Sequence, residues 1–198
     1  MVRSIPSHRI AGVDEVGRGC LFGPVVAAAV IIPAGGENQL AEIGVTDSKR
    51  LTPGQRSRLY AHIVSQTEAR IGLSSVREID RLNILQASLL AMKRALDRLQ
   101  TPPLLCLVDG NRPIPNLQIP QKTVVKGDQT EIAIAAASIV AKVWRDRLLE
   151  RLDRRYPGYC LASNKGYGSV QHRDALRSLG LTPQHRLSFS PCQRSLDL

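Results

Sequence analysis

The stretch RIAGVDEVGRGCLFGPVVAAAVII, residues 9–32, decides the fold of this chain. Residues 9–16 and 25–32 are two largely apolar runs, and glycines and a proline lie between them. This pattern predicts two strands joined by a glycine-rich turn. Two acidic residues, Asp14 and Glu15, interrupt the first run, which is unusual because a carboxylate is costly to bury.

Strand-like and helical segments alternate along the rest of the chain. Thr52 and Pro53 form a helix-start signal, an N-cap followed by proline at the first helical position. Leucine and methionine recur at steps of three and four over residues 82–99, which is typical of an amphipathic helix packed on a core. Strands that alternate with helices indicate an α/β fold. The sequence predicts further strands at 70–76, 104–110 and 122–128, and helices from 52 to about 68, at about 131–155 and near 170–179.

The composition is that of a globular protein with a strong positive charge. The chain has 198 residues, of which 43% are hydrophobic and 22% are charged, so a mainly disordered chain, a collagen and a coiled coil are excluded. Its net charge of +10 predicts a polyanionic partner, although a basic proteome with no nucleic-acid role would produce the same excess. Residues 142–198 hold 11 Lys and Arg against 5 Asp and Glu. We expect one domain, 1–198, in which the region from about 156 to 198 forms a small basic substrate-binding extension.

Neither the apolar segments nor the cysteines point to a membrane or to export. The longest apolar run, 25–32, has eight residues and is too short to cross a bilayer as a helix, and the N-terminus has no secretory apolar region. Cys20, Cys106, Cys160 and Cys192 lie far apart, without a C-x-x-C pair or a zinc-binding spacing. We therefore expect a cytoplasmic protein with free thiols and no membrane partner.

Acidic residues stand at or near the ends of three predicted strands. Asp14 and Glu15 lie in the first strand, Asp109 closes another and Asp128 follows a third. Each acid alone is explained equally well by a turn or a helix cap, and Asp128 is placed to cap the helix that follows it. Recurrence on three strands favours a shared site, because α/β folds commonly place their sites at strand ends.

Carboxylates that converge repel one another, so such a cluster needs cations. Two carboxylates about 5 Å apart repel by roughly 3 kcal/mol at an effective dielectric constant of about 20. No His or Cys accompanies these acids, and oxygen ligands alone point to Mg²⁺ or Mn²⁺. Hard divalent cations in a strongly basic protein suggest phosphodiester hydrolysis with two metal ions. Asp14 and Glu15 point to opposite faces of a regular strand, so we expect a bulge or a backbone carbonyl ligand there.

The segment after the acidic pair is suited to a nucleic acid. Gly17, Arg18 and Gly19 follow directly, and glycines let a backbone approach a ligand closely, while arginine pairs with phosphate. A simple tight turn has the same composition.

Two other segments carry candidate substrate-binding side chains. Ser48 and Lys49 lie in a predicted loop and suit a phosphate, or they are simply solvated. Tyr167 stands between two glycines, where it either stacks on a base or sugar or packs inside its own loop.

Together these motifs closely resemble those of the ribonuclease HII family, the type 2 ribonucleases H. The resemblance runs in order from about residue 10 to residue 191. It implies a ribonuclease H-like α/β fold, with a mixed central β-sheet flanked by helices and a mostly helical C-terminal part. It is carried by G-V-D-E-V-G-R-G and G-P-V-V-A-A-A-V, by D-S-K-R-L, E-I-D-R-L-N-I, L-V-D-G-N and K-G-D, and by A-A-A-S-I-V-A-K-V-x-R-D and N-K-G-Y-G-S.

The resemblance also implies an activity and the residues that perform it. It implies an endoribonuclease that uses Mn²⁺ or Mg²⁺, hydrolyses the RNA strand of RNA–DNA hybrids and cuts 5′ to ribonucleotides embedded in DNA. The products would carry 3′-hydroxyl and 5′-phosphate ends. The family's functional positions fall on four metal-binding acids, a loop that reads the 2′-hydroxyl and a sugar-stacking tyrosine: Asp14, Glu15, Asp109 and Asp128; Gly17, Arg18 and Gly19; and Tyr167.

The chain departs from the family pattern at two positions that follow Gly17, Arg18 and Gly19. Where the family commonly has G-R-G-P-L-A-G-P, this chain has Cys20 for proline and Phe22 for alanine. The change bears on the rigidity of the loop, but the acids and glycines are intact, so activity is expected. Three hypotheses stay open: a monomeric metal-dependent ribonuclease H, another nuclease of the same fold, and a non-catalytic basic module that binds nucleic acid.

Overall fold

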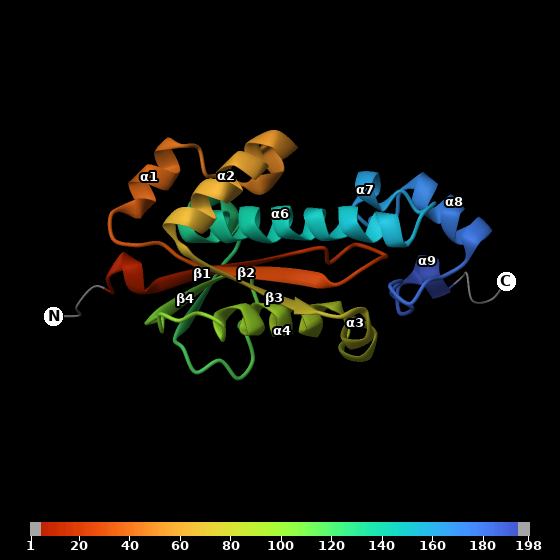
Figure 1. Cartoon of the computed structure of the whole chain (residues 1–198). Coiled ribbons are helices and arrows are strands. Elements are labelled where there is room, and N and C mark those ends of the chain that lie inside the picture. The colour runs from red at the N-terminus through yellow and green to blue at the C-terminus, as the bar shows by residue number, and fades with distance from the viewer. Residues whose placement is uncertain (1–4, 194–198) are drawn as a thin grey trace.

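A mixed five-stranded sheet forms the centre of the structure, a computed structural model that describes residues 5–193 (Figure 1). The strand order is β3-β2-β1-β4-β5, with antiparallel pairing among the first three strands and parallel pairing of β1 with β4 and of β4 with β5. This is the mixed sheet that the resemblance implies. The strands are β1 (Ile10–Val16), β2 (Val25–Ile31), β3 (Glu68–Ser74), β4 (Leu105–Asp109) and β5 (Gln121–Val124).

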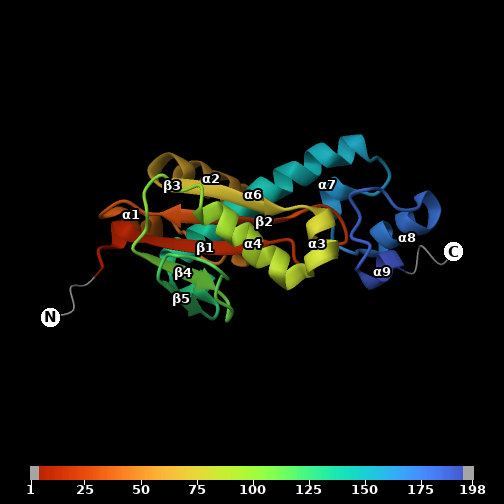
Figure 2. The ribbon, with the colours of Figure 1, turned by 90° about the horizontal axis from the view of Figure 1, so that it is seen from below.

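Helices cover both faces of the sheet. The long helix α6 lies along one face together with α1 and α2, and α3 and α4 lie on the other face (Figures 1 and 2). Within residues 5–193, no helix is both long enough and apolar enough to cross a membrane. The helices are α1 (Gly36–Glu42), α2 (Pro53–Gln66), α3 (Val76–Leu82), α4 (Ile84–Leu96), α5 (Gly127–Thr130), α6 (Ile132–Arg155), α7 (Leu161–Asn164), α8 (Val170–Leu179) and α9 (Ser190–Gln193), with 3₁₀ turns at Ser7–Arg9 and Ser48–Arg50.

Small residues let α6 lie close to β1. The alanines in the first half of α6 are buried between the helix and the sheet. At the closest point, a Cβ on Gly12 would come within 2.3 Å of the backbone carbon of Ala133. As predicted, α6 buries its apolar first half, and its charged last turns are largely exposed. The close approach brings the polar residues of α6 beside the end of β1.

The C-terminal lobe, residues 156–193, stands at one end of the sheet and contains α7, α8 and α9 (Figure 1). It packs around Phe22 and Leu149, both fully buried. Phe189 contacts this cluster and also the core between the sheet and α4, so the lobe is continuous with the main body. Residues 194–198, the end of the predicted extension, lie outside the described residues, as do residues 1–4.

Several elements differ from the sequence prediction. The helix predicted over 82–99 is α4, which begins only at Ile84 because Asn83 adopts a φ of 70° and its side chain caps α4 by accepting a hydrogen bond from the Gln86 N–H; Leu82 is the last residue of the preceding helix, α3. The strand predicted over 122–128 ends at Val124, and α5 follows it. Helices α1, α3, α5, α7 and α9 were not predicted.

Candidate active site

The parallel pairing of β1 with β4 brings two of the predicted acids side by side. Val13 pairs with Val108, so the next residues, Asp14 and Asp109, are neighbours at the ends of the two strands. Asp14 is only 6% exposed, and its Oδ1 accepts the Glu15 N–H at 2.7 Å. The sheet register therefore builds the centre of the site.

Glu15 reaches the same site without a break in its strand. The pairing of β1 with β2 continues in unbroken register along β1, so the bulge that the sequence suggested is not found in this described strand. Glu15 points to the opposite face from Asp14, but the pairing with β4 has already ended at Val13. Both carboxylates consequently line one cavity at the end of the sheet.

Asp128 joins the site through Lys49. It lies in α5, and Asp109 Oδ1 ties that helix to β4 by accepting the Gly127 N–H at 2.8 Å. Lys49 Nζ donates to Asp128 Oδ2 at 3.2 Å. Asp128 does not cap the long helix, because the N-cap position of α6 is Glu131. This removes the simplest structural explanation for Asp128.

The cavity measures about 290 Å³ and gathers the sequence-predicted residues. All of them except Asp128 line it. The structure adds Arg56, Ser138 and Lys142, which the sequence interpretation missed. Ser138 and Lys142 lie four residues apart in an otherwise apolar run of α6, and that spacing on one helix face was the available signal.

The carboxylates of the cavity repel one another. Burial raises the pKa of Asp14 well above its ordinary 3.8, and the charges of Glu15 and Asp109 raise it further. Burial also raises the pKa values of Glu15 and Asp109. Arg18 opposes this effect on Glu15, because its Nη1 donates to Glu15 Oε1 at 3.2 Å. The free site therefore carries negative charge that is only partly compensated.

Lys49 lies close to these negatively charged carboxylates. Partial burial opposes protonation of Lys49, but Asp128, Asp47 and Asp14 outweigh it and raise the pKa of Lys49. In the described part of the chain, no three His, Cys, Asp or Glu side chains are grouped closely enough to hold a metal ion. The four acids thus converge only in part, and the ammonium group stands where a cation is favoured.

The glycine loop, residues 17–19, borders the cavity. Gly17 has a φ of 90°, and a Cβ there would lie 2.2 Å from Nε of Arg145, so the protein itself requires glycine at this position. Gly19 is different, because a Cβ there would meet no heavy atom of the described residues within 4 Å. The backbone at Gly19 is therefore open to a ligand.

Ser48 and Tyr167 occupy contrasting positions at the cavity. Ser48 is 6% exposed, and its hydroxyl hydrogen bonds with that of Ser138 at 2.9 Å, so it is already paired within the protein. Tyr167 is 43% exposed, and its backbone pairs with Cys20 in an isolated β-bridge. A tyrosine packed inside its own loop, the alternative raised by the sequence, does not describe this residue.

The two departures from the family pattern are packed into the protein. Cys20 and Phe22 are both fully buried. Cys20 Sγ donates to the carbonyl of Lys165 at 3.6 Å, and the ring of Phe22 meets that of His185 edge-on with centroids 4.9 Å apart. These contacts anchor the glycine loop.

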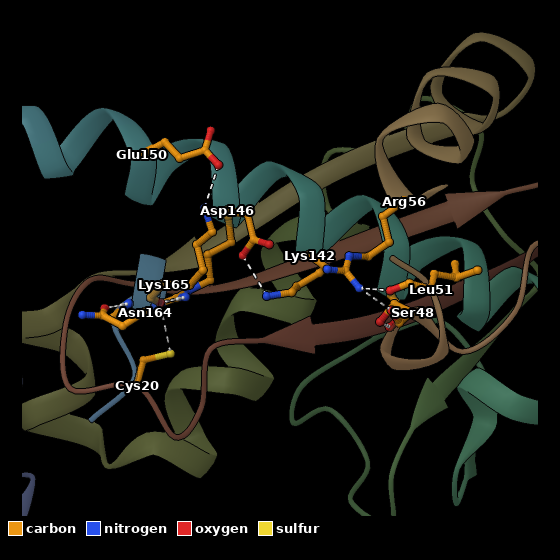
Figure 3. Close-up of polar contacts among 12 residues, drawn as sticks. Cys20, Ser48, Leu51, Arg56, Lys142, Asp146, Glu150, Asn164 and Lys165 are labelled. Atoms are coloured by element: carbon orange, nitrogen blue, oxygen red, sulfur yellow. Dashed lines mark hydrogen bonds and ion pairs between the residues drawn. The ribbon is translucent and has the colours of Figure 1, made fainter. Parts of the chain in front are cut away.

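Arginine and lysine side chains hold the walls of the cavity (Figure 3). Arg56 donates to the carbonyls of Ser48 and Leu51 and so fixes the segment that carries Lys49. Lys142 pairs with Asp146 at 2.8 Å on the next turn of α6. Positive groups therefore line the approach to the acids.

Comparison with known proteins agrees with the motifs and the geometry. The family model described as ribonuclease HII matches residues 11–192. The ribonuclease HII of Acaryochloris marina is 67% identical over 191 residues, which is 96% of each chain. The structure of ribonuclease H2 from Pyrococcus horikoshii OT3 matches with a TM-score of 0.80 and 28% identity, over 95% of this chain and 97% of that one. The structure of Bst-RNase HIII in complex with Mn²⁺ matches with a TM-score of 0.75 over 98% of this chain and 71% of that one, but at 19% identity this likeness concerns the fold alone.

Proposed function

Because the chain belongs to the ribonuclease HII family and is an endoribonuclease, we propose that it hydrolyses the RNA strand of RNA–DNA hybrids and cuts 5′ to ribonucleotides embedded in duplex DNA. The products carry 3′-hydroxyl and 5′-phosphate ends. One observation carries the proposal: three carboxylates, a glycine loop with an open backbone and a half-exposed tyrosine line the same cavity. Family membership favours this enzyme over a non-catalytic binding module.

The acids of the cavity fit a divalent cation. Their donors are carboxylate oxygens, which suit Mn²⁺ and Mg²⁺, and the contact of the Lys49 ammonium with Asp128 at 3.2 Å supports a site that attracts cations. A protein of the same fold, Bst-RNase HIII, has been solved with Mn²⁺. When bound, such an ion supplies an activated water and stabilises charge on the leaving oxygen. The residues that would hold it are Asp14, Glu15, Asp109 and Asp128.

Lys49 has a separate role at the phosphate. Its side chain is 81% exposed, so the ammonium group is free to move away from Asp128 once that carboxylate is otherwise neutralised. A lysine released in this way binds a substrate phosphate as a point charge. Ser48 contributes by holding its segment against Ser138 of α6.

Recognition of the sugar falls to the glycine loop and Tyr167. RNA and DNA offer the same phosphates, so the protein must sense the 2′-hydroxyl, which both donates and accepts hydrogen bonds. The open backbone at Gly19, beside Gly17 and Arg18, suits this contact. The half-exposed ring of Tyr167 lines the same cavity and suits stacking on the neighbouring sugar.

The test is cleavage of a DNA duplex that holds one ribonucleotide, with Mn²⁺, with Mg²⁺ and with EDTA. We expect one cut 5′ to the ribonucleotide, mapped to a 3′-hydroxyl end, in either metal and no cut in EDTA. Asp109→Asn should lower the rate roughly a hundredfold or more, because the site loses a ligand charge. Asp97→Asn, at an exposed ion pair with Lys93 on α4, is the matched control and should keep the rate. Cutting of an all-DNA duplex, or full activity of Asp109→Asn, would contradict the proposal.

The proposal extends to the state of the protein in the cell. We take residues 1–198 as one catalytic domain, because Phe189 joins the C-terminal lobe to the main core. We take it to act as a monomer in the cytoplasm. The free state of Cys20, Cys106, Cys160 and Cys192 supports a reducing compartment.

A further inference from the structure

Two fully buried arginines, Arg186 and Arg145, hold the backbone of the glycine loop and of the segment that follows it, residues 20–24. Arg186 Nη1 donates to the carbonyl of Arg18 at 2.8 Å, and its Nε donates to that of Gly23 at 3.0 Å. Buried guanidinium groups usually pair with carboxylates, whereas in the described structure both arginines donate to backbone oxygens. Arg145 of α6 donates in the same way, at 2.8 to 3.1 Å, to the carbonyls of Phe22, Pro24 and Lys165.

One N–H donor group of the Arg186 guanidinium lacks an acceptor in the described structure. Its Nη2 is buried and has no hydrogen-bond partner within residues 5–193. An unsatisfied buried donor destabilises the folded protein. Arg186 thus leaves one donor unpaired while its other side-chain donors hold the carbonyls of Arg18 and Gly23.

A directed hydrogen-bond chain runs through two buried histidines to Tyr167. The backbone N–H of Thr182 can only donate, so Nδ1 of His185, 2.9 Å away, accepts and carries no proton. The proton of His185 is then on Nε2 and is donated to Nε2 of His172 at 3.1 Å. His172 in turn donates from Nδ1 to the carbonyl of Tyr167 at 2.9 Å. A pure donor at one end and a pure acceptor at the other fix both tautomers.

Both histidines are neutral in this chain. Burial, together with the neighbouring His172, lowers the pKa of His185 to about 4. Burial also lowers the pKa of His172. A second proton on His172 would point at the Nε2–H of His185, and a second proton on His185 would point at the Thr182 N–H. This series of hydrogen bonds therefore forms only when both imidazoles are neutral.

The contacts of Arg186 and the histidine hydrogen bonds start in one short segment, residues 182–186, and end at the glycine loop and at Tyr167, which both line the cavity. The backbone N–H of Arg186 donates to the carbonyl of Leu21, and the N–H of Leu21 donates to Gly166, beside Tyr167. The glycine loop and the tyrosine are therefore tied to each other and to the same segment.

We infer that Arg186, His185 and His172 are positioning residues that set the glycine loop and Tyr167 in the relative placement needed to read a single ribonucleotide. The inference rests on the proposed function. The three side chains act through the backbone that they hold, so their removal should affect selectivity more than hydrolysis itself.

The test compares two substitutions of His172. Asparagine places an amide N–H near the position of Nδ1 and keeps the donor to Tyr167, whereas glutamine reaches toward His185 and loses that donor. The measured quantity is the ratio of kcat/KM on a duplex with one ribonucleotide to kcat/KM on a uniform RNA–DNA hybrid. In a uniform hybrid every nucleotide of the RNA strand is a ribonucleotide, so a ribose reaches the glycine loop wherever the enzyme binds. Cleavage of this substrate should therefore depend less on the exact position of Tyr167. We expect His172→Gln to lower the ratio by about fivefold or more, and His172→Asn to stay within about twofold of the wild type.

A ratio separates positioning from folding, because a loss of active protein lowers both rates equally. Arg186→Lys keeps the positive charge but loses the planar guanidinium that donates to two carbonyls at once, and it should lower the ratio of kcat/KM values in the same way. It also keeps the inference testable if His172→Gln does not fold. The matched controls are His62→Gln on the exposed face of α2 and Arg94→Lys, which pairs with Glu78 away from the site.

Two outcomes separate this inference from the proposed function. If the wild type cuts at a single ribonucleotide but neither His172→Gln nor Arg186→Lys changes the ratio, the positioning role is overturned and the proposed function stands. If the wild type does not cut at a single ribonucleotide, both are overturned.

Discussion

At the scale of single residues, Asp14 shows that the candidate site works against folding. Its carboxylate is buried beside Glu15 and Asp109, and burial followed by these charges holds its pKa well above the ordinary value. Each unit of such a rise destabilises the folded state by about 1.4 kcal/mol at a pH where the group is ionised. Lys49 and Arg18 relieve only part of this repulsion, so the folded protein is prepared for a cation.

Asp14→Asn should therefore stabilise the metal-free protein while it inactivates the enzyme. The amide keeps the shape and can still accept the Glu15 N–H, but it carries no charge. We expect the free energy of unfolding in EDTA to rise by about 1 kcal/mol at alkaline pH and turnover to fall roughly a hundredfold or more. Because the pKa of Asp14 is raised in the folded state, the wild type takes up a proton as the pH falls through that value, and the difference in stability should shrink.

Thermal unfolding in EDTA over a series of pH values measures this difference. Asp97→Asn is the control, because the carboxylate of Asp97 is exposed and paired with Lys93. It should change neither the free energy of unfolding nor the turnover by much. An Asp14→Asn protein that is less stable than the wild type at alkaline pH would show that the carboxylate makes a net favourable contact.

At the scale of elements, the distance between β1 and α6 sets the geometry of the site. Gly12 and the alanines of α6 allow the close contact that places Ser138 and Lys142 at the cavity. Any group that pushes α6 outward would move these side chains away from Asp14. The small residues of this interface are thus a condition for the site as well as for the core.

Gly12→Ala should destabilise the protein by about 2 kcal/mol or more, because the added Cβ meets backbone of α6 that cannot rotate away. Gly54→Ala is the matched control: it lies in the first turn of α2, where a Cβ meets no described atom within 4 Å. Alanine there should stabilise the protein by roughly 0.5 kcal/mol. Denaturant unfolding measures both, and equal stabilities of the two variants would mean that α6 shifts without cost.

At the scale of the whole molecule, the C-terminal lobe completes the fold, and little of its charge is free. Arg186 is buried, Lys165 pairs with Glu150 at 2.6 Å, and Arg177 pairs with Asp174. The positive charge predicted for this third of the chain is exposed mainly on the second half of α6, at Arg147, Arg151, Arg154 and Arg155.

Deletion of residues 156–198 should accordingly destabilise the whole protein. The deletion exposes the side chains of Leu21, Phe22 and Leu149. Exposure of each costs roughly 1.5–3 kcal/mol, and the sum is comparable to the free energy of unfolding of a typical domain. We expect a large fall in the midpoint of thermal unfolding and binding of a hydrophobic dye by the truncated chain. A truncated chain that unfolds at the temperature of the full chain would show that the lobe folds separately.

The sequence was sufficient to predict the α/β class, the five strands, the four longest helices and ten candidate site residues, nine of which line the cavity. These features depend on local chemistry. Alternating apolar runs, the Thr52–Pro53 helix start and the periodic leucines each specify an element within a few residues of the chain. Acidic residues are recognisable in apolar strands because a carboxylate there is costly unless a site uses it.

How these pieces meet became clear from the folded structure. The β1–β4 register placed Asp14 next to Asp109, and the early end of that pairing let Glu15 enter the same cavity. One positive φ, at Asn83, made α4 begin two residues later than the leucine pattern predicted. The roles of Arg145 and Arg186 were hidden for a different reason: all but one of the backbone carbonyls that they bind lie more than a hundred positions away along the chain. A buried polar group is stable only with its partners, and distant partners are brought to it by folding, which no local pattern records.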